Sequence, residues 1–248
     1  MVVKLHTVVK EIDRTSVDAR PAGPAIQLSD VIRIYREADV ETIALRGIDL
    51  EIAAGEFVAI MGRSGSGKST LLQLLAGSDR PTAGRVIVDG IDLSRAEEDE
   101  RARLRGAHVG IVFQSGNLVA FLDLEENVQL SAGLAGRPVD QATARAILAR
   151  VGLEGRERHR PAQLSGGEQQ RAALATVLVT EAPVVLADEV TGELDSANAD
   201  LLLDLMVEIQ RRTGMTLVLA THDPSVAARA DRLVELRDGR VVGDRRLR

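Results

Sequence analysis

The sequence predicts an α/β fold in which parallel strands alternate with helices, and three observations support this prediction. A short apolar run at 57–61 is followed at once by glycines and then by a buried helical pattern from residue 69, as in a strand, a tight turn and a helix. Apolar runs at 183–187 and 215–220 are continuous rather than alternating, which is typical of strands buried on both faces of a parallel sheet. The charged stretch at 93–155 carries helical patterns, so we expect a helical insertion within the α/β core.

The other expected elements lie on either side of this core. Turn residues bound each expected strand, and Asp238-Gly239 between apolar pairs predicts a hairpin near the end of the sequence. The expected elements are strands at 26–34, 43–52 and 81–90, helices at 97–104, 125–134 and 139–151, and a hairpin at 233–242.

The chain is expected to form a single domain preceded by an arm. Residues 1–25 end in Arg-Pro-Ala-Gly-Pro, a composition typical of a flexible linker. No internal repeat is visible in the remainder. We therefore expect one domain at 26–248, with a helical lobe at roughly 93–180.

Composition argues against several classes of protein. The net charge is −6, whereas nucleic-acid binding needs a basic face, so no nucleic-acid partner is expected. The chain has no cysteine, which excludes disulfides and thiolate metal sites. Its most apolar stretch, 172–187, is interrupted by Glu181 and Pro183 and is shorter than the roughly 20 residues of a membrane-spanning helix. A cytoplasmic protein is expected, and any pore that it serves would lie in another chain.

A glycine-rich segment after the first buried strand matches the phosphate-loop pattern Gly-x-x-x-x-Gly-Lys-Ser in full. Glycines let backbone N–H groups converge on phosphate oxygens, and the helix that follows adds the positive end of its dipole. Lys68 would reach the β- and γ-phosphates, and the Ser69 hydroxyl would hold Mg²⁺. Lys68 is the only lysine beyond residue 10 among 31 basic residues, which suggests a site that a planar guanidinium would not fit. The expected nucleotide contacts are Gly62, Arg63, Ser64, Gly65, Ser66, Gly67, Lys68, Ser69 and Thr70.

Two carboxylates follow the buried run at 183–187. A parallel sheet binds ligands outside the carboxyl ends of its strands, so Asp188 and Glu189 are expected to face the phosphates. Asp188 suits Mg²⁺ bound through water. Glu189 would orient or deprotonate the attacking water.

A second glycine-rich element, Leu-Ser-Gly-Gly-Glu-Gln-Gln-Arg at 164–171, leads into an apolar helix. Ser165 is a good cap, and the backbone of Gly166 and Gly167 offers N–H donors to an anion. The same residues are equally compatible with a plain capped helix. Because one nucleotide does not need two such sites from one chain, a head-to-tail dimer that covers the partner's γ-phosphate would explain both.

The segment 164–171 resembles the signature motif of ABC-type ATPases, and it lies between the phosphate loop and Glu189 as it does in that family. The other motifs of the family follow in the same order. On their own, Tyr35 and His222 would be unremarkable residues at strand ends, and their assignment comes from the resemblance. It identifies Tyr35 as the aromatic that stacks on adenine, Gln114 as the Q-loop glutamine that contacts Mg²⁺ and abuts the permease, Asp195 as part of the D-loop, and His222 as the switch histidine at the γ-phosphate.

The resemblance implies a phosphate-loop NTPase of ABC type, with a mixed sheet core, an antiparallel β edge and an inserted helical lobe. It implies an ATPase that uses ATP and Mg²⁺, forms a homodimer around two nucleotides and drives an integral-membrane permease from the inner face of the cell membrane. The implied catalytic residues are Glu189, His222, Gln114 and Lys68. The implied metal ligands are Ser69, Gln114 and Asp188, and the implied nucleotide contacts include Tyr35, Ser165, Gly166, Gly167, Glu168 and Asp195.

Within the family, residues 187–195 resemble a bacterial subgroup that includes ATPases of lipoprotein release, macrolide export and cell division. Export or extraction from the membrane is therefore expected, with a regulatory ATPase of the cell-division type as the alternative. The chain departs from the subgroup at Val190, where proline is usual and a looser turn at Glu189 could result, and at Thr176, where arginine is usual. A kinase or GTPase would have no use for the element at 164–171, and a soluble ABC ATPase of translation or repair would need two tandem cassettes.

Overall fold

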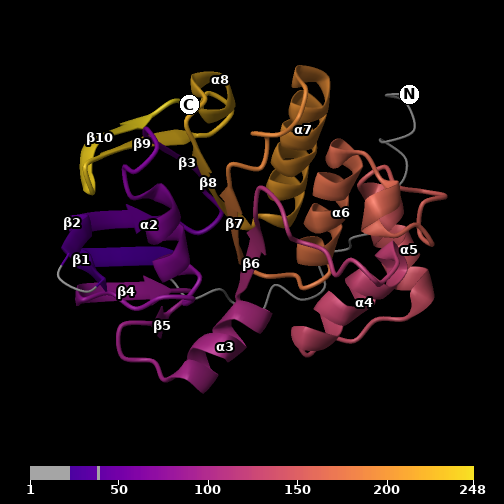
Figure 1. The fold of residues 1–248 in the computed structure, drawn as a ribbon, viewed down its shortest axis with the longest axis horizontal. Coiled ribbons are helices and arrows are strands. Elements are labelled where there is room, and N and C mark those ends of the chain that lie inside the picture. The colour runs from indigo at the N-terminus through magenta and orange to yellow at the C-terminus, as the bar shows by residue number, and fades with distance from the viewer. Residues whose placement is uncertain (1–22, 38–39) are drawn as a thin grey trace.

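The computed structural model describes residues 23–37 and 40–248, which form two sheets flanked by helices (Figure 1). The predicted arm at 1–25 lies outside the described residues except for 23–25. The strands are β1 (Ile26–Glu37), β2 (Val40–Ile52), β3 (Phe57–Met61), β4 (Ala83–Val88), β5 (Ile91–Asp92), β6 (Val109–Val112), β7 (Val184–Asp188), β8 (Thr216–Thr221), β9 (Arg232–Arg237) and β10 (Arg240–Arg246). The α-helices are α2 (Lys68–Leu75), α3 (Glu98–Ala107), α4 (Leu124–Leu134), α5 (Gln141–Arg150), α6 (Gly166–Leu178), α7 (Ser196–Thr213) and α8 (Pro224–Ala227).

A six-stranded sheet forms the core, with the strand order β10-β9-β3-β8-β7-β6. Its strands from β9 to β6 run parallel, and the β9–β10 hairpin adds an antiparallel edge. Successive side chains of β3 enter two different cores: Phe57 and Ala59 pack on one face, and Val58 and Ile60 on the other. A strand buried on both faces must be apolar throughout. This explains the continuous apolar runs and confirms the parallel sheet that they predict.

A second sheet, with the order β2-β1-β4-β5, is antiparallel and lies beside the first. Helix α2 lies between the sheets, since it contacts β2 and β4 on one side and β7 and β8 on the other. The leucines of α2 are buried between these layers. The expected mixed α/β architecture with an antiparallel β edge is therefore confirmed.

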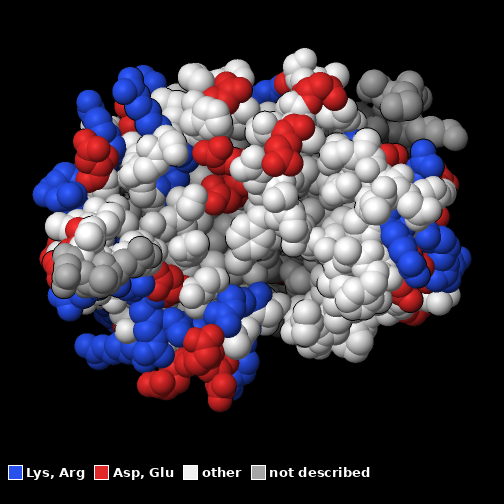
Figure 2. Space-filling view, viewed as in Figure 1, with Lys and Arg blue, Asp and Glu red and all other residues white. Residues whose placement is uncertain are grey.

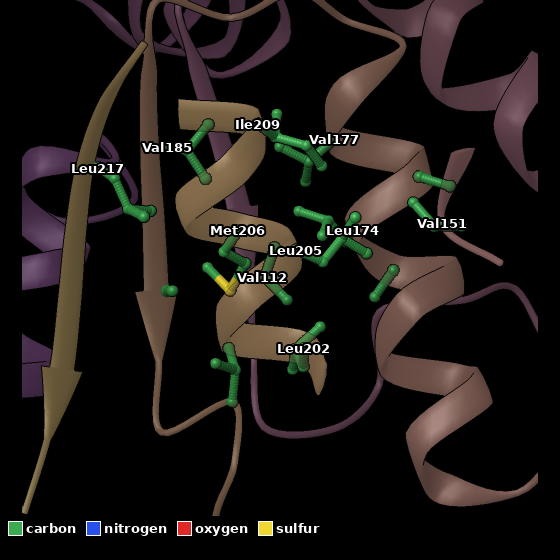
Figure 3. Close-up of a cluster of buried hydrophobic side chains, with 14 of the residues drawn as sticks. Val112, Val151, Leu174, Val177, Val185, Leu202, Leu205, Met206, Ile209 and Leu217 are labelled. Carbon is green, nitrogen blue, oxygen red and sulfur yellow. The ribbon is translucent and has the colours of Figure 1, made fainter. Parts of the chain in front are cut away.

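Helices α6 and α7 cover the opposite face of the six-stranded sheet. Figure 3 shows α7 between strands β7 and β8 and helix α6. Met206 and Ile209 of α7 share one buried cluster with Val185 of β7 and Leu174 of α6. This layer connects the sheet that carries the phosphate loop to the helix that carries residues 164–171.

Helices α4, α5 and α6 make up the helical lobe, at the right of Figure 1. The expected range of this lobe, about 93–180, needs one correction, because β6 lies within it and pairs with β7 in the central sheet. Gly110 of β6 allows α6 to pack closely, since a Cβ there would lie 2.3 Å from Cγ1 of Val177. The strand is short and follows the charged helix α3, so its own pattern is too weak to predict it.

Charged side chains are spread over the outer parts of the molecule in this view (Figure 2). Figure 2 shows basic and acidic residues mixed over α3 and near α5, whereas the face of the helical lobe beside α4 and α6 carries few charges in this view. Among the described residues, none of the helices has the length and apolar character needed to cross a membrane.

We expect Leu174→Ala to lower the free energy of unfolding by about 2–5 kcal/mol, because it leaves a cavity between α6 and α7. Leu174 is fully buried in this layer. Urea denaturation followed by circular dichroism measures the change. The matched control is Val242→Ala on β10, where the side chain is exposed and a change within about 0.5 kcal/mol is expected. Equal effects of the two substitutions would contradict the described packing.

Candidate functional site

The segment at 62–70 forms the turn between β3 and α2 together with the first residues of α2, and two of its glycines are required by close packing. A Cβ on Gly62 would lie 2.4 Å from the carbonyl oxygen of Leu236. Gly67 has φ +104°, and a Cβ there would lie 2.8 Å from the carbonyl oxygen of Ala44. No atom lies within 4 Å of the Cβ position of Gly65, so the outer side of the loop is open to a ligand.

The β9–β10 hairpin supports this loop from behind. The N–H of Gly239 donates to the carbonyl oxygen of Ser66 at 3.1 Å, and the N–H of Ser66 donates to Arg63 at 3.1 Å. Arg63 and Ser64 are exposed at the tip of the loop. The loop is thus held in shape by a part of the chain more than 170 residues away in the sequence.

Lys68 is almost fully buried, with 5% of its surface exposed. Its Nζ donates to the carbonyl oxygens of Gly62 at 2.9 Å and Arg63 at 3.3 Å. It also forms an ion pair with Oε1 of Glu189 at 3.3 Å. A compact ammonium can fold back over its own loop in this way, which a planar guanidinium cannot. The loop therefore carries a fixed positive charge.

Asp188 lies at the end of β7, and its environment fits a hydrated divalent cation. Its buried Oδ1 has no hydrogen-bond partner among the described residues, and its carboxylate accepts a hydrogen bond from Ser69. No group of three or more His, Cys, Asp or Glu residues suited to a metal occurs in the described part of the chain. Mg²⁺ commonly needs only one or two carboxylates together with water and substrate phosphates. Asp188 and Ser69 fit that donor set.

The pKa of Asp188 is raised above its ordinary value, chiefly by burial. The hydrogen bond from Ser69 opposes this shift and lowers the pKa, while the negative charge of Glu189 raises it further. The positive charge of Lys68 also lowers it. A bound cation would therefore stabilise the ionised form of this carboxylate.

Glu189 connects three segments of the site. Its Oε2 lies 3.0 Å from Nδ1 of His222, and its Oε1 faces Lys68. Its backbone adopts φ +48°, a conformation that is uncommon for a residue other than glycine. The N–H of Glu189 donates to Ala220 of β8 at 3.0 Å, which holds this backbone in place. The side chain is thereby aimed between the ends of β3 and β8.

Gln114 follows β6 and lines an open pocket of about 260 Å³ beside these residues. Its amide Nε2 donates to Oε1 of Glu193 at 3.3 Å. The remaining lining residues of the pocket are Ser69, Phe113, Ser115, Asp188 and Glu189. The structure therefore brings the predicted metal ligands Ser69, Gln114 and Asp188 to one pocket with Glu189.

The element at 164–171 begins α6 with the predicted serine cap. The Oγ of Ser165 accepts from the N–H of Glu168 at 3.3 Å, and Glu168 accepts from the N–H of Ser165 at 2.9 Å. This second hydrogen bond lowers the pKa of Glu168. Ser165 and Gly166 are exposed. Among the described residues, no hydrogen bond or ion pair links 165–168 to the phosphate loop, and none of these residues lines its pocket.

The turn that follows Glu189 reaches this element from the other side. A Cβ on Gly166 would lie 3.7 Å from Leu194, and one on Gly167 would lie 2.7 Å from Oδ1 of Asn198. The carboxylate of Asp195 caps α7, accepting from the N–H of Asn198 at 3.0 Å. Within one chain, Asp195 therefore binds its own helix, and its role as a nucleotide contact stays a prediction.

Tyr35, the predicted adenine platform, is held by two neighbours. Its hydroxyl donates to Oδ2 of Asp79 at 2.9 Å, and the guanidinium of Arg33 lies 4.4 Å from the centre of its ring. Arg33 also donates to Oδ2 of Asp79, at 2.8 Å. One face of the ring is thus occupied by Arg33, and stacking on adenine would use the other face.

Sequence reasoning missed two polar residues of the site, Gln170 and Glu193. Gln170 is buried on α6, and its Nε2 donates to the carbonyl oxygens of Phe113 and Gln114. Its position within the glutamine pair at 169–170 carried no signal of this contact. Glu193 lies between two recognised motifs and resembles any exposed acidic residue until Gln114 is placed beside it.

Comparison with known proteins matches residues 45–192 to the family model described as "ABC transporter". The chain is 48% identical over 223 residues to a protein of Hyphomonas neptunium described as "Macrolide export ATP-binding/permease protein MacB". A protein of the same description from Rhodopseudomonas palustris is 47% identical over 226 residues. These matches cover 89% and 90% of the chain but 34% of each relative. The chain therefore spans about a third of the length of these curated relatives.

Solved structures of two related proteins match this chain over most of their own length. The dimeric post-hydrolysis structure of the ATP-binding cassette MJ0796 bound to ADP and Pi superposes with a TM-score of 0.84 at 37% identity. That match covers 90% of this chain and 99% of the cassette. The structure of cbiO1 from Clostridium perfringens, part of the transporter complex cbiONQ, superposes with a TM-score of 0.78 at 30% identity and covers 91% of this chain and 89% of that one.

We expect Asp188→Asn to raise the melting temperature slightly at pH 7 in the presence of EDTA. Because the folded-state pKa of Asp188 lies above its unfolded value, the associated stability is present at low pH and is lost as the pH rises through the folded-state pKa. At pH 7 the ionised carboxylate therefore disfavours folding, and the asparagine does not.

Thermal melts from pH 7 down to pH 4 measure this effect, and the advantage of Asp188→Asn should shrink toward pH 4. The exposed substitution Glu154→Gln is the control and should leave the melting temperature unchanged. A lower melting temperature for Asp188→Asn at pH 7 would contradict the electrostatic account of the site.

Proposed function

The chain belongs to the ABC transporter family, and on this premise we propose that it is the ATP-binding and ATP-hydrolysing part of a transporter. It binds ATP with Mg²⁺, closes as a dimer around two nucleotides and drives a membrane permease, in export or in extraction from the membrane. The proposal rests on the contacts of the Glu189 side chain with Lys68 and His222 beside the open pocket.

Phosphate binding uses groups that already converge on the loop. Backbone N–H groups of 62–70 and the start of α2 favour negative charge. Phosphate oxygens would compete with Glu189 for Nζ of Lys68 and for His222, since both lie within 3.3 Å of its carboxylate. Binding of the γ-phosphate would thus release Glu189 to face a water molecule.

Hydrolysis follows from the position of Glu189. Its carboxylate accepts a proton from the attacking water, while the water oxygen bonds to the γ-phosphorus and the bond from that phosphorus to the bridging oxygen breaks. The products are ADP and phosphate. Ser69, Asp188 and Gln114 would hold Mg²⁺, which would supply stabilisation of the charge on the phosphate oxygens. Lys68 and His222 orient the γ-phosphate.

Completion of the site by a second copy explains the exposed start of this element at Ser165 and Gly166. Its capped helix start presents backbone donors to solvent rather than to the phosphate loop of the same chain. In a head-to-tail dimer, Ser165 and Gly167 would face the partner's γ-phosphate. The related cassette MJ0796 has a dimeric structure bound to ADP and Pi, which supports this arrangement. Tyr35 would supply the adenine platform in the same chain as the loop.

A membrane permease is the partner that the relatives favour. Their descriptions combine ATP binding with a permease and name macrolide export. The proposed location is the cytoplasmic face of the cell membrane, where ATP is available. The named export relatives favour transport over the alternative of a purely regulatory ATPase of the cell-division type.

For Glu189→Gln we expect ATP binding without turnover, so that the dimer persists. The amide keeps the shape of the side chain but cannot take a proton from water. Size-exclusion chromatography with ATP and Mg²⁺ should show a dimer that wild type shows only transiently, and Glu154→Gln should behave as wild type. A Glu189→Gln chain that remains monomeric with ATP and Mg²⁺ would refute the proposed closure.

For Lys68→Ala we expect the ATPase rate to fall by about 10²–10³ or more, by analogy with the loss of one preorganised electrostatic donor. Phosphate release measures the rate, and circular dichroism confirms that the variant is folded. A rate within a few-fold of wild type would remove Lys68 from the proposed mechanism.

A further inference from the structure

We infer that Glu193 is a positioning residue that fixes the side-chain amide of Gln114, leaving the carbonyl oxygen of that amide free for the metal. The inference rests on the proposed function, in which Gln114 is a ligand of Mg²⁺. Glu193 has no role in the mechanism described above. Its contact with Gln114 joins two segments that are 79 residues apart in the sequence.

The chemistry of the contact determines which end of the amide faces Glu193. Nε2 of Gln114 lies 3.3 Å from Oε1 of Glu193. An ionised carboxylate only accepts hydrogen bonds, so it attracts the NH₂ group and repels the carbonyl oxygen. With Nε2 bound to Glu193, the oxygen is left for the pocket that Gln114 shares with Ser69 and Asp188. That oxygen is the atom that a Mg²⁺ ion requires.

The rest of Gln114 is already fixed, which leaves amide rotation as its remaining freedom. Its backbone carbonyl oxygen accepts from Nε2 of the buried Gln170, which also donates to the backbone oxygen of Phe113 at 3.2 Å. Its side chain lies against Gly192, where a Cβ would be 3.4 Å from Nε2 of Gln114. The terminal torsion of glutamine is broad and nearly two-fold. Glu193 thus selects between two orientations that packing leaves open.

The turn that carries Glu193 also carries Glu189. The N–H of Gly192 donates to the carbonyl oxygen of Glu189 at 3.0 Å, and the N–H of Leu194 donates to Thr191 at 3.1 Å. Val190 anchors the turn in the core, with 1% of its surface exposed. One rigid turn therefore aims both the carboxylate that would activate water and the carboxylate that orients a metal ligand.

Orientation and simple charge attraction make different predictions for Glu193. An exposed carboxylate near a cation adds an attraction that salt screens, and this attraction would act whether or not Gln114 is present. Orientation acts only through Gln114. A double-mutant cycle with Gln114→Ala therefore separates the two effects.

The test measures the affinity for a non-hydrolysable ATP analogue by calorimetry over a range of Mg²⁺ concentrations, with EDTA as the metal-free baseline. For Glu193→Gln, which accepts either end of the amide, we expect the Mg²⁺ midpoint to rise about twofold, since half of the population is then misoriented. For Glu193→Lys, which binds the carbonyl oxygen, we expect a rise of about tenfold or more, as for other residues that orient metal ligands.

In the Gln114→Ala background, Glu193→Lys should have much less effect. Glu100→Lys on α3 is the matched charge control, since Glu100 is exposed, and it should leave the midpoint unchanged. Two results would overturn this inference, provided that binding in EDTA stays normal. One is an unchanged Mg²⁺ midpoint for both Glu193 variants, and the other is an equal effect of Glu193→Lys with and without Gln114. A wild-type chain that binds no analogue under any condition would instead overturn the proposed function, and this inference with it.

Discussion

The pair of contacts from Glu189 to Lys68 and His222 is the interaction on which the rest of the site depends. The three residues follow β3, β7 and β8, which are neighbours in the sheet, so the carboxyl ends of parallel strands bring them together. The left-handed backbone of Glu189 costs about 1–3 kcal/mol, which its hydrogen bond to Ala220 and the buried Val190 offset. Lys68 and His222 are also expected to bind phosphate oxygens, so the contacts that stabilise the site are those that a nucleotide would exchange.

The turn from Glu189 to Asp195 extends this constraint to the helical lobe. It contacts Lys68 and His222 through Glu189, Gln114 through Glu193 and the start of α6 through Leu194. Its end caps α7, which packs between the sheet and α6. If phosphate binding displaces Glu189, the start of α6 should therefore move as well. This is the element that we propose to complete the partner's site.

The sequence predicted those features whose signals lie in neighbouring residues. The glycine-rich loop and the apolar runs carry their own signals, and the serine cap of α6 does too. β6 became a strand through its pairing with β7, and α7 was not anticipated because its pattern starts directly after a motif recognised for other reasons. Gln170 and Glu193 act across 56 and 79 residues, so no local pattern reveals them. Val190, which stands in place of the usual proline, is buried in the core.

The central claim, that one chain's phosphate loop is completed by a second chain's capped helix, is tested most directly by Gly166→Asp in the Glu189→Gln background. The fold should tolerate this change, because a Cβ there meets only Leu194 at 3.7 Å and an acidic residue suits a helix start. Sedimentation and nucleotide affinity are measured together, with ATP and Mg²⁺. The account predicts that ATP still binds while the dimer is lost, because the added carboxylate repels the partner's phosphate. A dimer as stable as that of Glu189→Gln alone would contradict it.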